Sequence, residues 1–324
     1  MSSNIMVGNT QLSDIKIGNI DISKVYVGDI VVFSKQTIVT DLKPVLAWEF
    51  KGHTGNVNSV AVDKEGNVYS GSYDNTVRKI SSEGTELWQF KGHTNWVNSV
   101  TVDTQNNVYS GSYDNTVKKI SNTGTEIWKF TGHGDGIKSV SVDNQYNVYS
   151  GSRDRTVRKI SNTGTEIWKF TGHTSHVNSV AVDTQYNVYS GSSDRTVRKI
   201  SKEGTQIWEF TGHTDSINSV AVDKEGNVYS CSYDNTVRKI SNTGTEIWQF
   251  TGHTDWINSV TVDTQNNVYS CSFDTTVRKI SSEGAEIWQF IGHVDTNVNS
   301  VAVDDRYNVY TGSNDKIVRK IKQE

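Results

Sequence analysis

The chain has 324 residues, of which 34% are hydrophobic and 21% are charged, and its formal net charge is −4. This length can bury a large core, and the single proline and 10% aromatic content exclude a collagen-like or disordered chain. The mild acidity argues against a broad electrostatic surface for nucleic acid, so we expect no nucleic-acid partner.

The N-terminus shows no targeting signal. Residues 1–20 lack a basic start followed by an apolar run, and no apolar segment of the chain approaches the length needed to span a membrane. We therefore expect synthesis in the cytoplasm without a signal peptide, and no membrane insertion.

Residues 6–35 repeat a ten-residue unit, written MVGNTQLSDI, KIGNIDISKV and YVGDIVVFSK. The Gly-Asn and Gly-Asp pairs favour tight turns and the flanking Val and Ile favour strands, which predicts small β-hairpins. Such strands bury little alone, so residues 1–35 are interpreted as a segment that attaches to a protein partner or subunit. The alternative is a locally β-rich or disordered leader without a dedicated partner. Residues 36–44 are interpreted as a linker.

A forty-residue segment recurs seven times in the remainder of the chain. Each copy contains a Gly-His pair, with a Trp five residues before the His. In the first copy, residues 57–63, 67–72, 76–81 and 86–90 read as four strands, here named a to d, because they are rich in Val, Tyr, Ile and Trp between Gly, Asn and Asp clusters. A repeat of this period with four antiparallel strands is typical of a propeller blade.

The ends of the repeat region predict how the ring closes. The sequence AWEF (47–50) is an outer strand with no inner strands before it, and the last copy ends at IVRKIKQE (317–324) without an outer strand. We therefore expect an all-β fold, a seven-bladed β-propeller over residues 45–324, in which AWEF completes the last blade and removes an open sheet edge.

Two sequence patterns in the repeats resemble known propellers. The pattern GH…SxD…TVRKI resembles the WD-repeat family across residues 45–324, although Ile80-Ser81 stand where that family usually has Trp-Asp. The outer strand GTELWQF is similar to the tryptophan-docking motif of quinoprotein-type propellers. Nothing else indicates a quinone, so we interpret this motif as packing and assign no cofactor.

The N-terminal stretch ISKVYVGDIVVFS (22–34) resembles short β modules of bacteriophage tail and baseplate proteins. This resemblance implies that the segment anchors the chain to a virion or to another subunit.

Each blade supplies His, Ser and Asp, which are the ingredients of a hydrolase triad. Seven equivalent sets do not fit an enzyme with one asymmetric pocket, and the WD-repeat resemblance implies a buried hydrogen-bond network. We therefore predict a structural role, with no catalytic residue. One His per blade also lacks the ligand spacing of a metal site. Because Ile80 cannot donate a hydrogen bond, the network should be one member shorter than in that family. The predicted members are His53, Ser70 and Asp74; His93 and Asp114; His133 and Asp154; His173 and Asp194; His213 and Asp234; His253 and Asp274; and His293 and Asp315, with Thr311 in place of Ser in the last blade.

The d–a and b–c connections lie at one end of an antiparallel blade, and we name this end the variable face. The turns at the other end draw on a few interchangeable sequences, whereas the variable face differs in chemistry from copy to copy. We predict that it binds a protein or a glycan, because exposed aromatic side chains beside charges are typical of such surfaces. The alternative is that the Trp rings only lie flat on neighbouring loops. The candidate ligand-binding residues are Trp96, Tyr113, Arg153, Arg155, His176, Arg195, Asp255, Trp256 and Phe273.

Three functions compete on this evidence. The favoured one is a non-enzymatic structural or binding protein, in particular a phage tail or virion component that presents the propeller to a host-surface glycan or protein. The second is an intracellular WD-repeat-type scaffold for protein interactions. An enzyme is disfavoured because no carboxylate pair, metal cluster or phosphate loop breaks the repeat symmetry. The phage resemblance would place the protein in a virion, and otherwise we expect it in the cytoplasm.

Overall fold

The computed structural model describes residues 16–17, 20–21, 24–27, 30–34, 43–293 and 296–323, and before residue 43 it describes the backbone only. The chain divides into two units, Met1–Leu42 and Lys43–Glu324.

The first unit contains two short antiparallel pairs. Strand β1 (Lys16–Ile17) pairs with β2 (Ile20–Asp21), and β3 (Lys24–Val27) pairs with β4 (Ile30–Ser34). These pairs are the small hairpins that the Gly-Asn and Gly-Asp turns predict. The rest of the predicted attachment segment 1–35 and nearly all of the predicted linker 36–44 lie outside the described residues, so both roles stay predictions.

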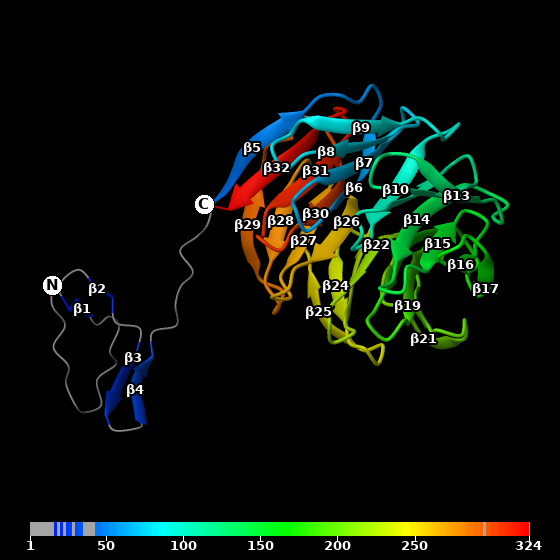
Figure 1. Ribbon diagram of the computed structural model, residues 1–324. Helices are drawn as coiled ribbons and strands as arrows, with labels where there is room; N and C mark the ends of the chain where they lie inside the picture. Colours follow the sequence, from blue (N-terminus) through cyan, green and yellow to red (C-terminus); the bar gives the residue numbers. More distant parts are fainter. Residues whose placement is uncertain are drawn as a thin grey trace. The chain divides into compact units, whose positions relative to one another are not determined.

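The second unit consists of seven four-stranded antiparallel sheets arranged in a ring, and the predicted seven-bladed propeller is confirmed (Figure 1). Blade 1 contains β6 (Val57–Val62), β7 (Val68–Ser72), β8 (Val77–Ile80) and β9 (Glu86–Phe90). Blade 2 contains β10 (Val97–Val102), β11 (Val108–Ser112), β12 (Val117–Ile120) and β13 (Glu126–Phe130). Blade 3 contains β14 (Ile137–Val142), β15 (Val148–Ser152), β16 (Val157–Ile160) and β17 (Glu166–Phe170).

The remaining blades repeat this order. Blade 4 contains β18 (Val177–Val182), β19 (Val188–Ser192), β20 (Val197–Ile200) and β21 (Gln206–Phe210). Blade 5 contains β22 (Ile217–Val222), β23 (Val228–Ser232), β24 (Val237–Ile240) and β25 (Glu246–Phe250). Blade 6 contains β26 (Ile257–Val262), β27 (Val268–Ser272), β28 (Val277–Ile280) and β29 (Glu286–Phe290). Blade 7 contains β30 (Val298–Val303), β31 (Val309–Ser313), β32 (Val318–Gln323) and β5 (Pro44–Phe50).

Blade 7 closes the ring with strands from both ends of the propeller. Strand β5 pairs antiparallel with β32, with Phe50 opposite Val318 and Trp48 opposite Lys320, so the predicted position of AWEF is confirmed (Figure 1). The strand is longer than that sequence, because β32 extends to Gln323 and pairs there with Pro44. The pairing covers the edge of β32 that would otherwise be open.

The core is a ring of seven hydrophobic clusters, and each lies between two adjacent blades. Between blades 1 and 2, for example, Tyr69, Val77 and Phe90 pack against Val97 and Val108. Each blade is therefore covered on both faces by its neighbours, and this explains why every residue of the second strands, such as β7, is buried.

The outer-strand tryptophans join each blade to the next one. Trp48 Nε1 of blade 7 donates a hydrogen bond to the backbone oxygen of Ser82 in the c–d turn of blade 1, at 2.9 Å. Its ring lies against Gly84, which has φ +88° and where an added Cβ would meet the ring at 3.1 Å. The turn therefore needs glycine both for its backbone conformation and for the close approach of the indole. Trp88 repeats these contacts on blade 2.

The contact from blade 6 to blade 7 is built differently, because blade 7 has no c–d turn. The side chain of Gln323 takes the place of that turn: its Oε1 accepts hydrogen bonds from Lys279 Nζ at 2.8 Å and from Trp288 Nε1 at 3.4 Å. Trp288 is only 8% exposed. The C-terminal end of β32 thus replaces the turn that the other blades use.

Candidate functional site

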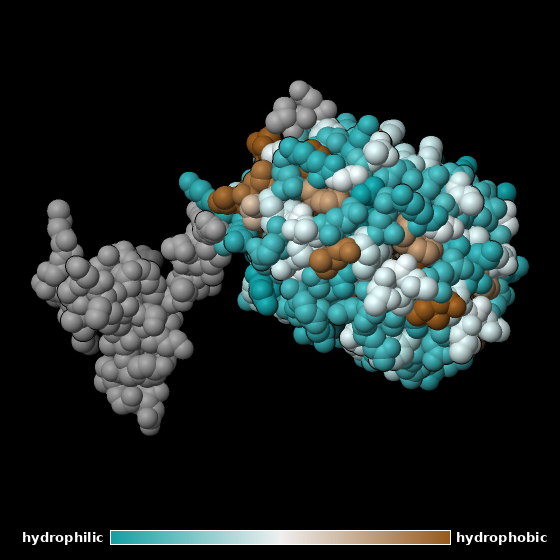
Figure 2. All heavy atoms as spheres, turned by 45° about the horizontal axis from the view of Figure 1, so that its top comes forward, coloured by the Kyte–Doolittle hydropathy of each residue, from teal (hydrophilic) through white to brown (hydrophobic). Residues whose placement is uncertain are grey.

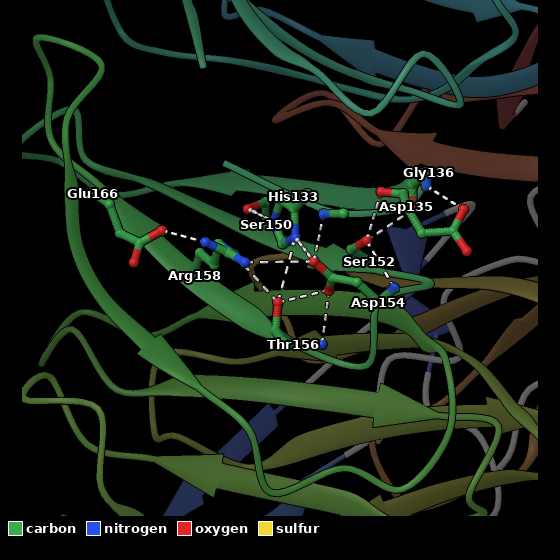
Figure 3. Close-up of polar contacts among 10 residues, drawn as sticks. His133, Asp135, Gly136, Ser150, Ser152, Asp154, Thr156, Arg158 and Glu166 are labelled. Carbon is green, nitrogen blue, oxygen red and sulfur yellow. Dashed lines mark hydrogen bonds and ion pairs between the residues drawn. The ribbon is translucent and has the colours of Figure 1, made fainter. Parts of the chain in front are cut away.

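A buried polar network recurs beneath the variable face in blades 1 to 6, and Figure 3 shows it in blade 3. In blade 1, His53 Nδ1 lies 2.7 Å from Asp74 Oδ2 and His53 Nε2 lies 2.7 Å from Ser70 Oγ. The ionised carboxylate accepts from Nδ1–H, so Nε2 accepts from the serine hydroxyl. The carboxylate also accepts from the backbone N–H of Thr54, which joins the d–a loop to the b–c turn.

The carboxylates of this network are held ionised. Burial favours the protonated acid, yet the hydrogen bonds from His53 and Thr76 and the N–H of Thr54 outweigh it and hold the pKa of Asp74 far below its usual range. The same balance lowers the pKa of the equivalent carboxylates, which are Asp114, Asp154, Asp194, Asp234 and Asp274.

The expectation of a network one member shorter is wrong, because two residues of the c strand join it. Thr76 Oγ1 donates to Asp74 Oδ1 at 2.6 Å, and Arg78 Nε donates to Thr76 Oγ1 at 3.4 Å. Arg78 Nη1 also binds Glu86 Oε2 of the outer strand at 2.5 Å. These two residues could have been found from the sequence, because the Thr and the basic residue of TVRKI recur in blades 1 to 6. That stretch was interpreted above only as a strand.

Blade 7 departs from this arrangement, and here the predicted His–Asp contact is wrong. His293 Nε2 lies 3.0 Å from Thr311 Oγ1, but its Nδ1 contacts Arg319 Nη1 at 2.9 Å. Arg319 in turn donates to Asp315 Oδ2 at 2.6 Å. Ile317 stands where the other blades have Thr and offers no hydroxyl, and the guanidinium lies between the imidazole and the carboxylate.

Because of this difference, His293 should make stability depend on pH in a separate window. Burial, followed by the positive charge of Arg319, lowers its pKa from 6.5 to about 4. The unfolded chain therefore binds the proton more readily, so this contribution is complete above pH 6.5 and is lost as the pH falls towards 4, by roughly 3 kcal/mol. We expect His293→Gln to remove most of this pH dependence in urea unfolding measured from pH 7 to pH 4. An unchanged slope in the variant would contradict the assignment.

The His-Ser-Asp geometry matches that of a hydrolytic triad, but its hydroxyl is not accessible. Ser70 is 0% exposed, and its equivalents in the other blades are buried to the same degree. A nucleophile has to reach its substrate, so the arrangement serves to satisfy buried polar groups and to join loops.

On the variable face, Trp96 lies between two tyrosines from different blades. Its ring stacks on that of Tyr73, with centroids 4.0 Å apart and planes 16° apart, and it lies 5.5 Å from Tyr113. The ring nevertheless stays 40% exposed. The sequence left open that the ring only lies flat on neighbouring loops. The ring does pack on these loops, but a large part of the Trp96 side chain still faces solvent.

Trp256 has the same surroundings between blades 5 and 6. It stacks on Tyr233 at 4.2 Å and 24°, lies 5.5 Å from Phe273 and is 43% exposed. Asp255 Oδ1 accepts from the backbone N–H of Trp256 at 2.7 Å, so this carboxylate shapes the loop. We name these two groups the aromatic clusters: Tyr73–Trp96–Tyr113 and Tyr233–Trp256–Phe273. Tyr73 and Tyr233 were not among the predicted residues, because each belongs to the blade before the one whose b–c turn carries Tyr113 or Phe273.

The predicted basic residues divide into two groups. Arg153 lies over the Tyr113 ring, with Cζ 5.4 Å from the centroid, and its charge acts on His176. Arg155 and Arg195 are exposed turn residues with φ of 68° and 69°. The charge of Arg155 also acts on His176, although Arg155 does not stack on the Tyr113 ring as Arg153 does.

A central channel of about 820 Å³ opens between the two aromatic clusters. The first strands of all seven blades line it, and Tyr73, His176, Tyr233 and Phe273 also contribute to its wall. Members of both aromatic clusters thus share one cavity with His176.

The circumference of the propeller also exposes apolar side chains, with one Leu or Ile per outer strand, such as Leu87 at 53%. On the face that Figure 2 shows, the surface is mostly hydrophilic and carries several hydrophobic patches. Single exposed apolar residues of this kind are normal on a protein surface, so we assign no site to them.

Within the described residues, no helix is long and apolar enough to cross a membrane. In the same part of the chain, no three His, Cys, Asp or Glu side chains gather as a metal site would require.

The closed ring of repeats, with one polar network in each of six blades, defines a repeat-type β-propeller. The family model described as outer membrane protein assembly factor BamB matches residues 73–192, 153–289 and 193–322, and the model for the WD domain, G-beta repeat, matches residues 44–80. The chain is thus a seven-bladed β-propeller, and over residues 73–322 it belongs to the family whose model is described as outer membrane protein assembly factor BamB, while residues 44–80 are similar to the WD repeat.

The crystal structure of the WD40 β-propeller domain of Doa1 is similar, with a TM-score of 0.79 and 26% sequence identity. The alignment covers 87% of this chain and 97% of that domain. No curated protein sequence matches the chain. None of these findings shows a likeness to phage tail or baseplate proteins, so that resemblance gains no support from them.

Proposed function

We propose that the protein is a non-enzymatic scaffold whose variable face binds a segment of a protein partner. The observation that carries this proposal is the pair of aromatic clusters. Each presents a Trp that is about two-fifths exposed and is stacked on a tyrosine that lines the central channel.

The internal copies show that folding alone does not need these tryptophans. The same loop position holds Asn56, Gly136, His176 or Ser216 in four other blades, and those loops make the same backbone hydrogen bond to the b–c turn. A rigid, half-exposed aromatic ring is the kind of group that anchors protein partners. The likeness to WD-repeat propellers favours a protein partner over the host-surface glycan that the sequence also allowed.

The proposed role of residues 1–35 in attachment, and with it a place in a virion, would add a second contact to this scaffold. The attachment role rests on the small hairpins expected from the sequence, and the place in a virion rests on the sequence resemblance alone. The binding role of the variable face does not depend on it.

A random peptide display library selected on the immobilised full chain tests the proposal. We expect an enriched peptide to bind more weakly to Trp96→Ser and to Trp256→Ser, each by about 1–3 kcal/mol in titration calorimetry. Serine is the natural residue of blade 5 at this position, so both variants should keep the fold and the thermal stability of the wild type.

Gln105→Ala is the matched control, because Gln105 lies in the a–b turn at the opposite end of the propeller. Peptide affinity should be the same as in the wild type. Equal affinity of all four proteins would show that the aromatic clusters are not the binding surface.

A further inference from the structure

A ring of asparagines surrounds the channel and is broken at one blade. In six blades the second residue of the a strand is Asn, and its Nδ2 donates to a backbone oxygen at the start of the next blade. The pairs are Asn58 to Val97, Asn98 to Ile137, Asn178 to Ile217, Asn218 to Ile257, Asn258 to Val298 and Asn299 to Val57. In blade 3 this position is Lys138, which also lines the channel. Among near-identical copies, one blade has therefore exchanged a structural amide for a positive charge.

The Lys138 ammonium group lies close to the Tyr113 ring, and a second cation, Arg153, contacts the same ring. Lys138 Nζ lies 5.6 Å from the ring centroid and 3.4 Å from the hydroxyl, and Arg153 Cζ lies 5.4 Å from the same centroid. One aromatic ring cannot neutralise two cations, and their mutual repulsion makes the place favourable for an anion.

Within the described residues, neither cation has a carboxylate at ion-pair distance. In the same blade, by contrast, Arg158 binds both Asp154 and Glu166. The nearby acid is Asp135, whose Oδ1 accepts from the backbone N–H of Gly136 at 2.6 Å.

His176 completes this sector from blade 4 and lines the channel with Lys138. Burial and then the positive charge of Arg153 lower its pKa, as do Lys138 and Arg155, whereas Asp135 raises it. Three cations and one carboxylate therefore act on the imidazole at this side of the channel.

We infer that the channel mouth at Lys138, Arg153 and His176 is a carboxylate site that takes acidic side chains of the partner segment. The inference rests on the proposed function and adds the chemistry of the partner: Glu or Asp side chains enter beside Tyr113, where they accept hydrogen bonds from Lys138 and Arg153. The aromatic clusters on either side would hold the apolar part of the same segment. The basic sector faces one side of the opening only, so the acidic residues also set the direction in which the segment binds.

The carboxylate site is tested with a capped tri-glutamate peptide, followed by NMR of the His176 imidazole. The other seven of the eight His residues are at most 5% exposed, so His176 gives a separable titrating signal. We expect tri-glutamate to move this resonance in a saturable way and to raise the pKa of His176, because a bound anion favours the imidazolium. Capped tri-glutamine should do neither.

Lys138→Asn is the decisive variant, because six other blades have Asn at this position. The variant should therefore also gain the side-chain hydrogen bond that those blades make to the backbone of the next blade. It should bind tri-glutamate about tenfold more weakly and keep the stability of the wild type. Arg153→Tyr, which copies Tyr113 and Tyr233, should act in the same direction. Lys64→Asn removes the same charge from the opposite end and should leave binding unchanged.

Unaltered tri-glutamate binding in Lys138→Asn would overturn the inference, as would an equal response to inorganic phosphate, which would indicate a general anion site. The two proposals fail separately. Loss of tri-glutamate binding in Lys138→Asn, together with unchanged peptide affinity in the Trp variants, would keep the carboxylate site and reject the aromatic anchors. Peptides selected on the wild type should also be rich in Glu or Asp. Selection of neutral or basic peptides would contradict the carboxylate site and leave the proposal for the aromatic clusters standing.

Discussion

Replacing residues 45–50 with a Gly/Ser segment of the same length should lower the free energy of unfolding by more than about 5 kcal/mol and make the chain self-associate. The segment carries Phe50, which packs with Val57, Val60 and Val318 in the cluster that joins blades 7 and 1. Truncating a buried Phe alone costs about 3–5 kcal/mol. The replacement also removes the Trp48 hydrogen bond to blade 1 and leaves the edge of β32 unpaired, ready to pair with another chain.

Urea unfolding followed by circular dichroism measures the first effect, and sedimentation velocity measures the second. The same replacement at residues 36–41, which precede β5, is the control and should alter neither the unfolding curve nor the sedimentation coefficient of the propeller. A monomer of wild-type stability in the 45–50 variant would mean that β5 does not hold the ring closed.

The fold could be predicted almost completely because the sequence repeats it seven times. A local pattern that is ambiguous in one copy becomes reliable when every copy places its turns at the same offsets. The unequal ends of the repeat region, with AWEF before the first copy and TVRKI-like IVRKI at the end of the last, also determined which strands meet. The start of β5 at Pro44 was not predictable, since it depends on how far β32 extends beyond its repeat.

The polar network was predicted in its residue types and only partly in its connections. Sequence spacing brings His53, Ser70 and Asp74 together, but it does not show that Thr76 and Arg78 lie on the same side of their strand as these groups. In blade 7 the substitution of one Thr by Ile317 redirects Arg319 between the imidazole and the carboxylate. This rearrangement depends on how three strands are placed relative to one another, and that placement cannot be read from any single position of the sequence.

On the variable face, too, contacts between neighbouring blades could not be predicted from the sequence. Comparison of the copies singles out Trp96 and Trp256, which are exposed, but it does not predict that the ring of each stacks on a tyrosine of the preceding blade. Lys138 was not predicted, because it stands inside a strand, where a difference between copies indicates only a tolerated change. Its significance depends on a contact between blades: six asparagines at the same position bridge neighbouring blades around the channel.

Acid should unfold the propeller between about pH 4 and pH 2. In blades 1 to 6 the pKa of one buried Asp is held far below its usual range, as for Asp74 and Asp194. A carboxyl with a depressed pKa contributes stability that is complete above its unfolded pKa of about 3.9 and is lost as the pH falls through the folded value. Each contributes roughly 2 kcal/mol, so six together contribute roughly 12 kcal/mol, which is as large as the 5–15 kcal/mol typical of the whole free energy of unfolding.

The variant Asp194→Asn separates this effect from general acid denaturation. At pH 7 it should lower the free energy of unfolding by about 1–3 kcal/mol, because an amide cannot satisfy the His173 Nδ1–H and the Thr196 hydroxyl as an ionised carboxylate does. As the pH falls below about 3.9, the unfolded wild-type chain binds a proton at Asp194 that the folded protein does not yet bind, so the wild type loses this stability and the difference between the two proteins should shrink. Urea unfolding of both proteins from pH 7 to pH 2 measures this convergence. A difference that stays constant over the whole range would mean that ionisation of Asp194 does not stabilise the blade, and that the network holds its loops through neutral hydrogen bonds and packing.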